Sequence, residues 1–111
     1  MKGDLFFIES YFNKLINFEE LKIKTKRCFD EILQDEKSAI FEDCTEEEIS
    51  KIKNSTIKYS DTYIFINNIG SFPFFRIKYD LYFEESNIPN FTYEVEYNVN
   101  GEILDDYFLE I

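Results

Sequence analysis

The chain has 111 residues, of which 44% are hydrophobic and 19% aromatic, and it carries a formal net charge of −11. This length suits a single domain with its own core. The negative charge argues against nucleic acid and anionic membranes as partners, because phosphate binding requires cationic side chains. Most of the excess lies at one end: from Tyr79 to Ile111 there are nine acids and no Lys or Arg.

Catalytic signatures are missing from the sequence. There is no histidine, and the three glycines do not form a phosphate-binding loop. Asp105 and Asp106 are adjacent on a predicted strand, so their carboxylates would point to opposite faces rather than converge. Cys28 and Cys44 lack metal-ligand spacing. We therefore expect no enzyme activity, no catalytic residue, no metal and no cofactor. With no signal peptide and no apolar run of membrane length, we also expect a cytoplasmic protein with reduced thiols.

Three helices are predicted between about residues 4 and 54. The first begins after Asp4, and its apolar residues cover most of the circumference. Such a helix is either central to the core or part of a subunit contact, which could be a homodimer through its aromatic surface. The second runs from Glu19 to about Glu36, with one face formed by Leu21, Thr25, Cys28, Phe29, Ile32 and Leu33. The third runs from Glu46 to about Lys53, because Thr45 and Glu48 have capping-box spacing.

Acidic residues gather around the start of this third helix. Glu46, Glu47 and Glu48 are explained by the positive end of the helix dipole. Glu42 and Asp43 precede the helix and have no such explanation. We interpret the group as an acidic knob that contacts a partner.

From Asn54 onward the apolar period changes from 3.6 to 2, which predicts strands from about residue 56 to 111. In the first strand, Ile57, Tyr59, Tyr63 and Phe65 are expected to share one side. Later inward positions are Phe75, Ile77, Tyr79, Leu81, Phe83, Phe91, Tyr93, Val95, Tyr97 and Val99. The predicted fold is a single α+β domain in which about three helices pack on one face of a four-stranded antiparallel meander.

The last two strands should be joined at Asn100-Gly101, a pair that favours a two-residue hairpin turn. The final strand, from Glu102 to Ile111, has an acid on each face. We therefore expect a bulge or an edge position near Asp105. On the exposed face, Arg76 or Lys78 could pair across strands with Glu94 or Glu96.

The acidic composition, the order of helices before a meander and the ending Tyr97-Asn98-Val99-Asn100-Gly101-Glu102-Ile103-Leu104-Asp105-Asp106-Tyr107 resemble the small acidic immunity proteins of bacterial polymorphic and contact-dependent toxin systems. The resemblance implies a protein that binds a basic toxin domain, such as a ribonuclease, and blocks its active site or substrate groove. Complementary charge would also speed association. The expected partner-binding residues are Glu42, Asp43, Glu46, Glu47, Tyr82, Glu94, Glu96, Glu102, Asp105 and Asp106.

A second hypothesis belongs to a different class. In a small-ligand or assembly module, the aromatic residues would line a pocket between helices and sheet, and the negative charge would only confer solubility. The residues expected in that pocket are Tyr59, Tyr63, Tyr79, Tyr93 and Tyr97.

Overall fold

The computed structural model describes residues 16–35, 37–65 and 73–111. Their elements follow in the order α2 (Phe18–Gln34), a 3-10 turn η1 (Ala39–Phe41), α3 (Glu46–Lys53), β1 (Thr56–Phe65), β2 (Phe74–Tyr82), β3 (Phe91–Tyr97) and β4 (Ile103–Glu110). The four strands form one antiparallel sheet in the order β1-β2-β3-β4. The predicted α+β meander is therefore confirmed.

The prediction of three helices is met in part, since the described residues contain two α-helices. The helix predicted after Asp4, and the homodimer expected from its aromatic surface, lie outside the described residues. Among the described residues, no helix is long and apolar enough to cross a membrane.

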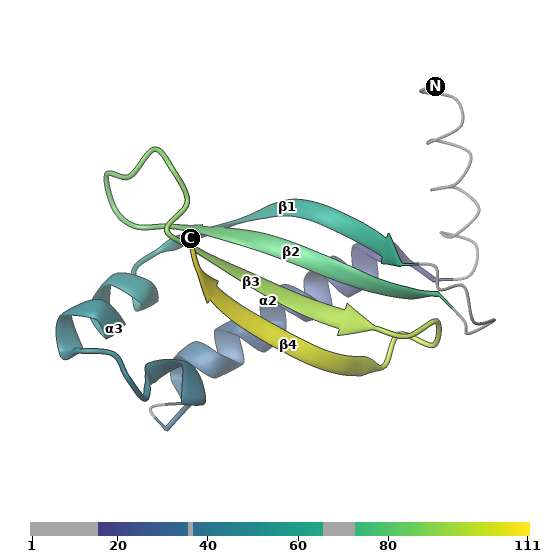
Figure 1. Cartoon of the computed structure of the whole chain (residues 1–111), viewed down its shortest axis with the longest axis horizontal. Coiled ribbons are helices and arrows are strands. Elements are labelled where there is room, and N and C mark those ends of the chain that lie inside the picture. The colour runs from purple at the N-terminus through teal and green to yellow at the C-terminus, as the bar shows by residue number, and fades with distance from the viewer. Residues whose placement is uncertain (1–15, 36, 66–72) are drawn as a thin grey trace.

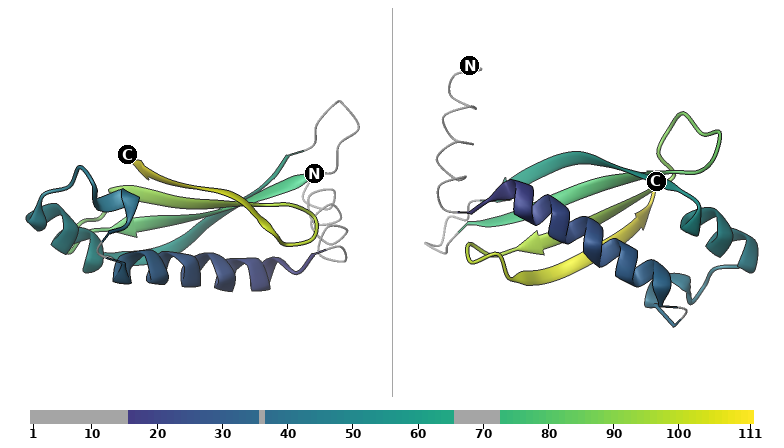
Figure 2. Two further views of the ribbon diagram at one scale, coloured as in Figure 1. Left: turned by 90° about the horizontal axis from the view of Figure 1, so that it is seen from below. Right: turned by 180° about the vertical axis from the view of Figure 1, so that it is seen from behind.

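Helix α2 lies along one face of the sheet and leaves the other face without a described helix (Figures 1 and 2). It begins where the Asn17 side chain accepts hydrogen bonds from the backbone N–H groups of Glu19 and Glu20. Its buried residues are Phe18, Leu21, Thr25 and Phe29, spaced three or four positions apart. This is the apolar face expected from the sequence, and it packs on β2 and β3.

Helix α3 lies beyond the end of the sheet, beside the loop that joins β2 to β3 (Figure 1). The predicted capping box is present: the Glu48 N–H donates to Thr45 Oγ1 at 3.1 Å, and the Thr45 N–H donates to Glu48 Oε1 at 3.4 Å. Ile52 is fully buried and anchors this helix to the core.

The core lies between α2 and the sheet and is largely aromatic. Phe29 of α2 contacts the rings of Tyr93 and Phe108, with centroids 5.3 and 6.3 Å apart. Phe18 meets Phe75 edge to face at 5.3 Å. As predicted, the inward residues of the two central strands are buried: Phe75, Ile77, Tyr79, Leu81, Tyr93, Val95 and Tyr97.

A bulge in β1 changes the side on which its later residues lie. Tyr59 pairs with Tyr79, but Asp61 pairs with Lys78, so one extra residue, Ser60, falls between them. The prediction that Tyr63 and Phe65 share a face with Ile57 and Tyr59 is therefore wrong. Each residue after the bulge takes the opposite side, because side-chain direction in a strand alternates with a period of two.

The β3–β4 hairpin also differs from the prediction. The Gly101 N–H donates to the Asn98 carbonyl at 3.0 Å, and the Asn98 N–H donates to the Glu102 carbonyl at 3.0 Å. The connection thus has three residues, with only Gly101 at positive φ (+76°), rather than a two-residue Asn100-Gly101 turn. The Asn98 side chain explains the difference, because its Oδ1 accepts the N–H groups of Asn100 and Glu102.

Strand β4 has both features expected near Asp105. It is an edge strand, and its pairing with β3 shifts between Glu96 and Tyr97, which leaves Leu104 as the extra residue. Asp105 and Asp106 follow this bulge and lie on opposite sides of the sheet, because adjacent residues of a strand alternate.

Candidate functional site

The face of the sheet turned away from α2 is the strongest candidate for a functional surface, and we call it the open face. Figure 1 looks onto it, with α2 behind the sheet. The strand register assigns to it Thr56, Lys58, Asp61, Tyr63, Phe65, Phe74, Arg76, Lys78, Asp80, Tyr82, Thr92, Glu94, Glu96, Asp105, Tyr107 and Leu109. Charged residues dominate its centre, as expected for a face outside the apolar core.

Arg76 and Glu96 form the best-defined interaction on the open face. They pair directly across β2 and β3, and Arg76 Nη2 donates to Glu96 Oε1 at 2.9 Å. The Tyr107 hydroxyl donates to the other oxygen, Glu96 Oε2, also at 2.9 Å. Glu96 therefore has a partner for each carboxylate oxygen. The hydrogen bond to Glu96 raises the pKa of both Arg76 and Tyr107.

The Arg76 guanidinium also contacts two aromatic rings. Its central carbon lies 5.2 Å from the centroid of Phe65 and 4.7 Å from that of Tyr107. Such contacts stabilise a planar cation, which has a weakly hydrated face. Phe65 takes part because the β1 bulge places it on this face, so the sequence alone did not reveal this arrangement.

Glu94, two residues before Glu96 on the same face, has a different environment. Only 7% of its surface is exposed. Register places it between Lys78 on β2 and Tyr107 on β4. Among the described residues it forms no hydrogen bond and no ion pair, and Lys78 likewise forms no ion pair within 4.0 Å. The predicted cross-strand pairing therefore holds for Arg76 and Glu96, but not for Lys78 and Glu94.

Two further groups on this face have unused hydrogen-bonding capacity. Arg76 Nε and Asp80 Oδ1 are buried side-chain atoms without a partner among the described residues. Asp80 lies diagonally from Glu94, because it pairs with Thr92. Buried polar groups are usually satisfied, so these two atoms are exceptions on this face.

The ten residues predicted to bind a partner do not form one surface. Tyr82, Glu94, Glu96 and Asp105 lie on the open face. Asp106 pairs with Val95 on the helix face and accepts a hydrogen bond from the Tyr93 hydroxyl at 3.1 Å. Glu102 lies in the hairpin, where the Asn98 side-chain amide donates to it at 3.1 Å.

The acidic knob lies at the other end of the sheet from this hairpin, beside α3 (Figure 1). Glu42 and Asp43 follow η1, and Glu46 and Glu47 occupy the first turn of α3; all four are exposed. Glu47 reaches Lys51 at 3.6 Å. The structure thus brings together four of the predicted residues, and it adds Arg76, Lys78 and Asp80, whose outward positions the β2 alternation had already indicated.

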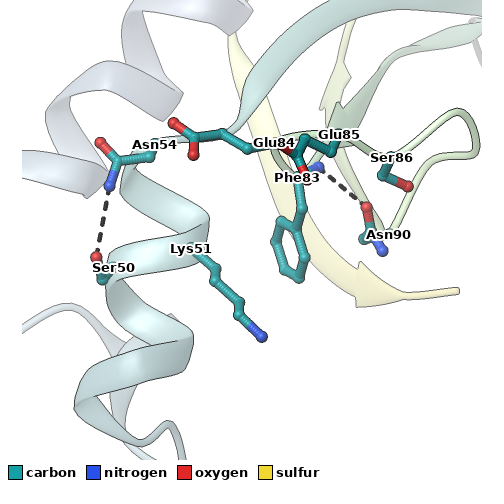
Figure 3. Close-up of a pocket in the computed structure, with 8 residues that line it drawn as sticks. All are labelled: Ser50, Lys51, Asn54, Phe83, Glu84, Glu85, Ser86 and Asn90. Carbon is teal, nitrogen blue, oxygen red and sulfur yellow. Dashed lines mark hydrogen bonds between the residues drawn. The ribbon is translucent and has the colours of Figure 1, made fainter.

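A hollow of about 680 Å³ lies between α3 and the β2–β3 loop. Figure 3 shows its lining, which is Ser50, Lys51, Asn54, Phe83, Glu84, Glu85, Ser86 and Asn90. Glu84 and Glu85 are exposed, and Glu85 adopts a positive φ of 64°. Without a buried unsatisfied polar group, this hollow is a weaker candidate than the open face.

The aromatic residues expected to line a ligand pocket mostly pack into the core. Tyr79, Tyr93 and Tyr97 are buried, and each hydroxyl is hydrogen-bonded. Tyr63 lies on the open face, away from the other four tyrosines. The two cysteines are free, and burial raises the pKa of both thiols, which keeps them protonated at neutral pH.

Comparison with known proteins adds no family to this description. No protein-family model matches the chain, and neither the curated proteins nor the solved structures contain a significant match.

Proposed function

We propose that this chain is a binding protein, not an enzyme, and that it recognises a basic protein surface through its open face. The observation that carries the proposal is Glu94. It is a carboxylate in a residue that is only 7% exposed, without a hydrogen bond or ion pair among the described residues, on a face that no described helix covers. A covered carboxylate lacking a partner is costly, and a cation from a second molecule would remove that cost.

The charge of the open face supports a cationic partner. The described residues place three cations there, Lys58, Arg76 and Lys78. They face five acids, which are Asp61, Asp80, Glu94, Glu96 and Asp105. The whole chain carries −11, so the long-range field has the same sign as the face. Such a field attracts basic surfaces and accelerates their association.

The more specific form of the proposal is an immunity protein that neutralises a toxin domain, as the resemblance of the C-terminal hairpin implies. A nuclease must bind phosphate, so its substrate groove is basic. A sheet face bearing carboxylates can occupy that groove and exclude the nucleic acid. We confine the contact to Tyr82, Glu94, Glu96 and Asp105, since the other predicted residues lie away from this face.

The test uses the gene immediately upstream, because an immunity gene follows its toxin gene. The C-terminal domain of that upstream product is expressed in bacteria with and without this chain, and growth is measured. We expect the chain to restore growth and to form a complex with the domain. Asp105→Lys, an exposed charge reversal on the open face, should weaken the complex more than Glu46→Lys in the acidic knob.

Two results would overturn the proposal. One is a toxic domain that the wild-type chain neither binds nor neutralises. The other is equal weakening by Asp105→Lys and Glu46→Lys, which would assign the effect to net charge rather than to the open face.

A further inference from the structure

The open face contains an internal example of how it holds a guanidinium. Arg76 donates to Glu96 at 2.9 Å, and its guanidinium lies over the rings of Phe65 and Tyr107. One carboxylate and aromatic surface thus accommodate one planar cation on this sheet. A second carboxylate lies near the same tyrosine. Glu94 is the direct cross-strand neighbour of Tyr107 and lies two residues before Glu96 on β3.

Glu94 differs from Glu96 in having nothing bound. Both oxygens of Glu96 accept hydrogen bonds, whereas Glu94 accepts none among the described residues. Its neighbour Lys78 lies directly across from it on β2 and forms no ion pair within 4.0 Å in the part of the chain that the structure describes. Arg76 attracts the Glu94 charge but is already bonded to Glu96. The described residues therefore supply Glu94 with nearby positive charge but with no hydrogen-bond donor.

The oxygens of Glu94 remain reachable from outside. The buried side-chain atoms that lack a partner among the described residues are Arg76 Nε and Asp80 Oδ1, and the Glu94 oxygens are not among them. Only 7% of the residue is exposed, so a partner group would have to approach closely to reach this carboxylate.

We propose that Glu94 receives the guanidinium of an arginine presented by the basic partner. This inference rests on the proposed function and deepens it by naming the group that the partner inserts. An arginine suits the position better than a lysine for two reasons. Its planar fork has five N–H donors and can bond Glu94 while reaching toward Asp80 on the diagonal. It is also more weakly hydrated, so entering a covered position costs it less.

The first experiment needs no protein partner. Carboxyl ¹³C resonances of the whole chain are followed by NMR during titration with L-argininamide. L-citrullinamide, which keeps the α-amino group and has an uncharged side chain of the same shape, serves as the control. We expect a saturating shift at Glu94 that exceeds the shift at the exposed Glu110. Citrullinamide should leave Glu94 unchanged. Equal shifts at Glu94 and Glu110, or the same response to citrullinamide, would overturn the proposal.

The second experiment uses the complex with the upstream toxin domain. Glu94→Gln keeps the shape of the side chain and removes its charge, and Glu110→Gln is the matched control on an exposed acid of β4. Loss of one member of a desolvated charge pair costs 2 kcal/mol or more, so Glu94→Gln should weaken binding by at least about 30-fold. Binding by Glu110→Gln should stay within about threefold of wild type.

The two proposals can fail separately. If the wild-type chain neutralises the toxin domain and Glu94→Gln binds it as tightly as wild type, the arginine site is wrong and the proposed function stands. If argininamide saturates at Glu94 but no toxic upstream product is neutralised, the arginine site stands and the proposed function is wrong.

Discussion

The two faces of the sheet differ in how completely their polar groups are hydrogen-bonded. On the helix face, the Tyr79 hydroxyl donates to the Lys22 carbonyl, Tyr93 donates to Asp106, and Tyr97 bonds Thr25. On the open face, the buried atoms Arg76 Nε and Asp80 Oδ1 have no partner among the described residues. Glu94 also forms no hydrogen bond or ion pair within the part of the chain that the structure describes. The helix face is thus organised for stability. The open face retains polar groups without partners among the described residues, a difference that supports the proposed role in recognition.

The largest expected effect is the loss of unfolding free energy when a buried side chain on the helix face is truncated. Phe29 is 1% exposed and packs on Tyr93 and Phe108. Phe29→Ala should lower the free energy of unfolding by about 3–5 kcal/mol, because it removes buried apolar surface and leaves a cavity. The matched change on the open face is Tyr63→Ala, at a side chain 38% exposed, which should cost about 1 kcal/mol or less. Urea denaturation measures both, and similar losses would contradict the contrast.

A smaller effect is expected from a single hydroxyl on the helix face. Thr25 Oγ1 donates to the Leu21 carbonyl at 2.7 Å, so its one proton is used and the Tyr97 hydroxyl donates to Thr25. Tyr97→Phe should lower the free energy of unfolding by about 1–2 kcal/mol. Tyr82→Phe on the open face is the control and should change it by less than about 0.5 kcal/mol. Equal losses in urea denaturation would contradict this prediction.

Alkaline pH should destabilise the fold through the buried tyrosines of the helix face. Burial raises the pKa of Tyr97 to about 12 and also raises those of Tyr79 and Tyr93. In the unfolded chain these phenols ionise near pH 10. The stability they contribute is therefore fully present below pH 10. It falls as the pH rises toward 12, because the unfolded state then binds fewer protons than the folded state.

Denaturation midpoints measured between pH 9 and pH 12 would follow this loss. Tyr97→Phe removes one of the shifted phenols and should make the decline shallower, whereas Tyr82→Phe should leave its slope as in wild type. A midpoint that stays constant up to pH 12 would be inconsistent with buried neutral tyrosines.

The smallest expected effect is the difference in unfolding free energy between glutamine substitutions at Glu96 and Glu94 on the open face. Glu96→Gln weakens the bonds to Arg76 and Tyr107 and should cost about 1 kcal/mol, a modest value for a partly exposed pair. Glu94→Gln loses no hydrogen bond among the described residues, so we expect a change within about 0.5 kcal/mol or a slight stabilisation. Chemical denaturation of both variants at low salt would decide. A larger loss for Glu94→Gln would indicate that its charge supports the fold.

Local sequence patterns correctly predicted the elements that depend mainly on residues close together in the chain. The capping box at Thr45 and Glu48 depends on neighbours three positions apart, and α3 begins where that spacing predicted. Alternation alone identified the apolar side of β2 and β3 that faces α2, because both strands lie in the centre of the sheet. It did not predict that Thr92 and Glu94, on the opposite side of β3, are buried as well. The face of α2 followed from its 3.6-residue period in the same way.

Edge strands were harder to predict, since their bulges depend on pairing with the neighbouring strand. The shift at Ser60 moved Tyr63 and Phe65 to the open face, and Phe65 there contacts Arg76. No residue in β1 marks the bulge in advance. The length of the hairpin was likewise decided by the Asn98 side chain, which accepts hydrogen bonds from the loop backbone. The prediction considered only the turn preference of Asn100 and Gly101.

The sequence by itself determined the α+β class, the central strands and the concentration of negative charge after Tyr79, because these depend on composition and short-range period. Only the tertiary structure distinguished Glu94 from Glu96. The two acids have the same side chain, the same strand and the same face, and they differ in what lies across from them. Arg76 and Tyr107 converge on Glu96, while Glu94 is left covered and without a hydrogen bond among the described residues. Such a difference arises from strand register, which couples residues far apart in the chain.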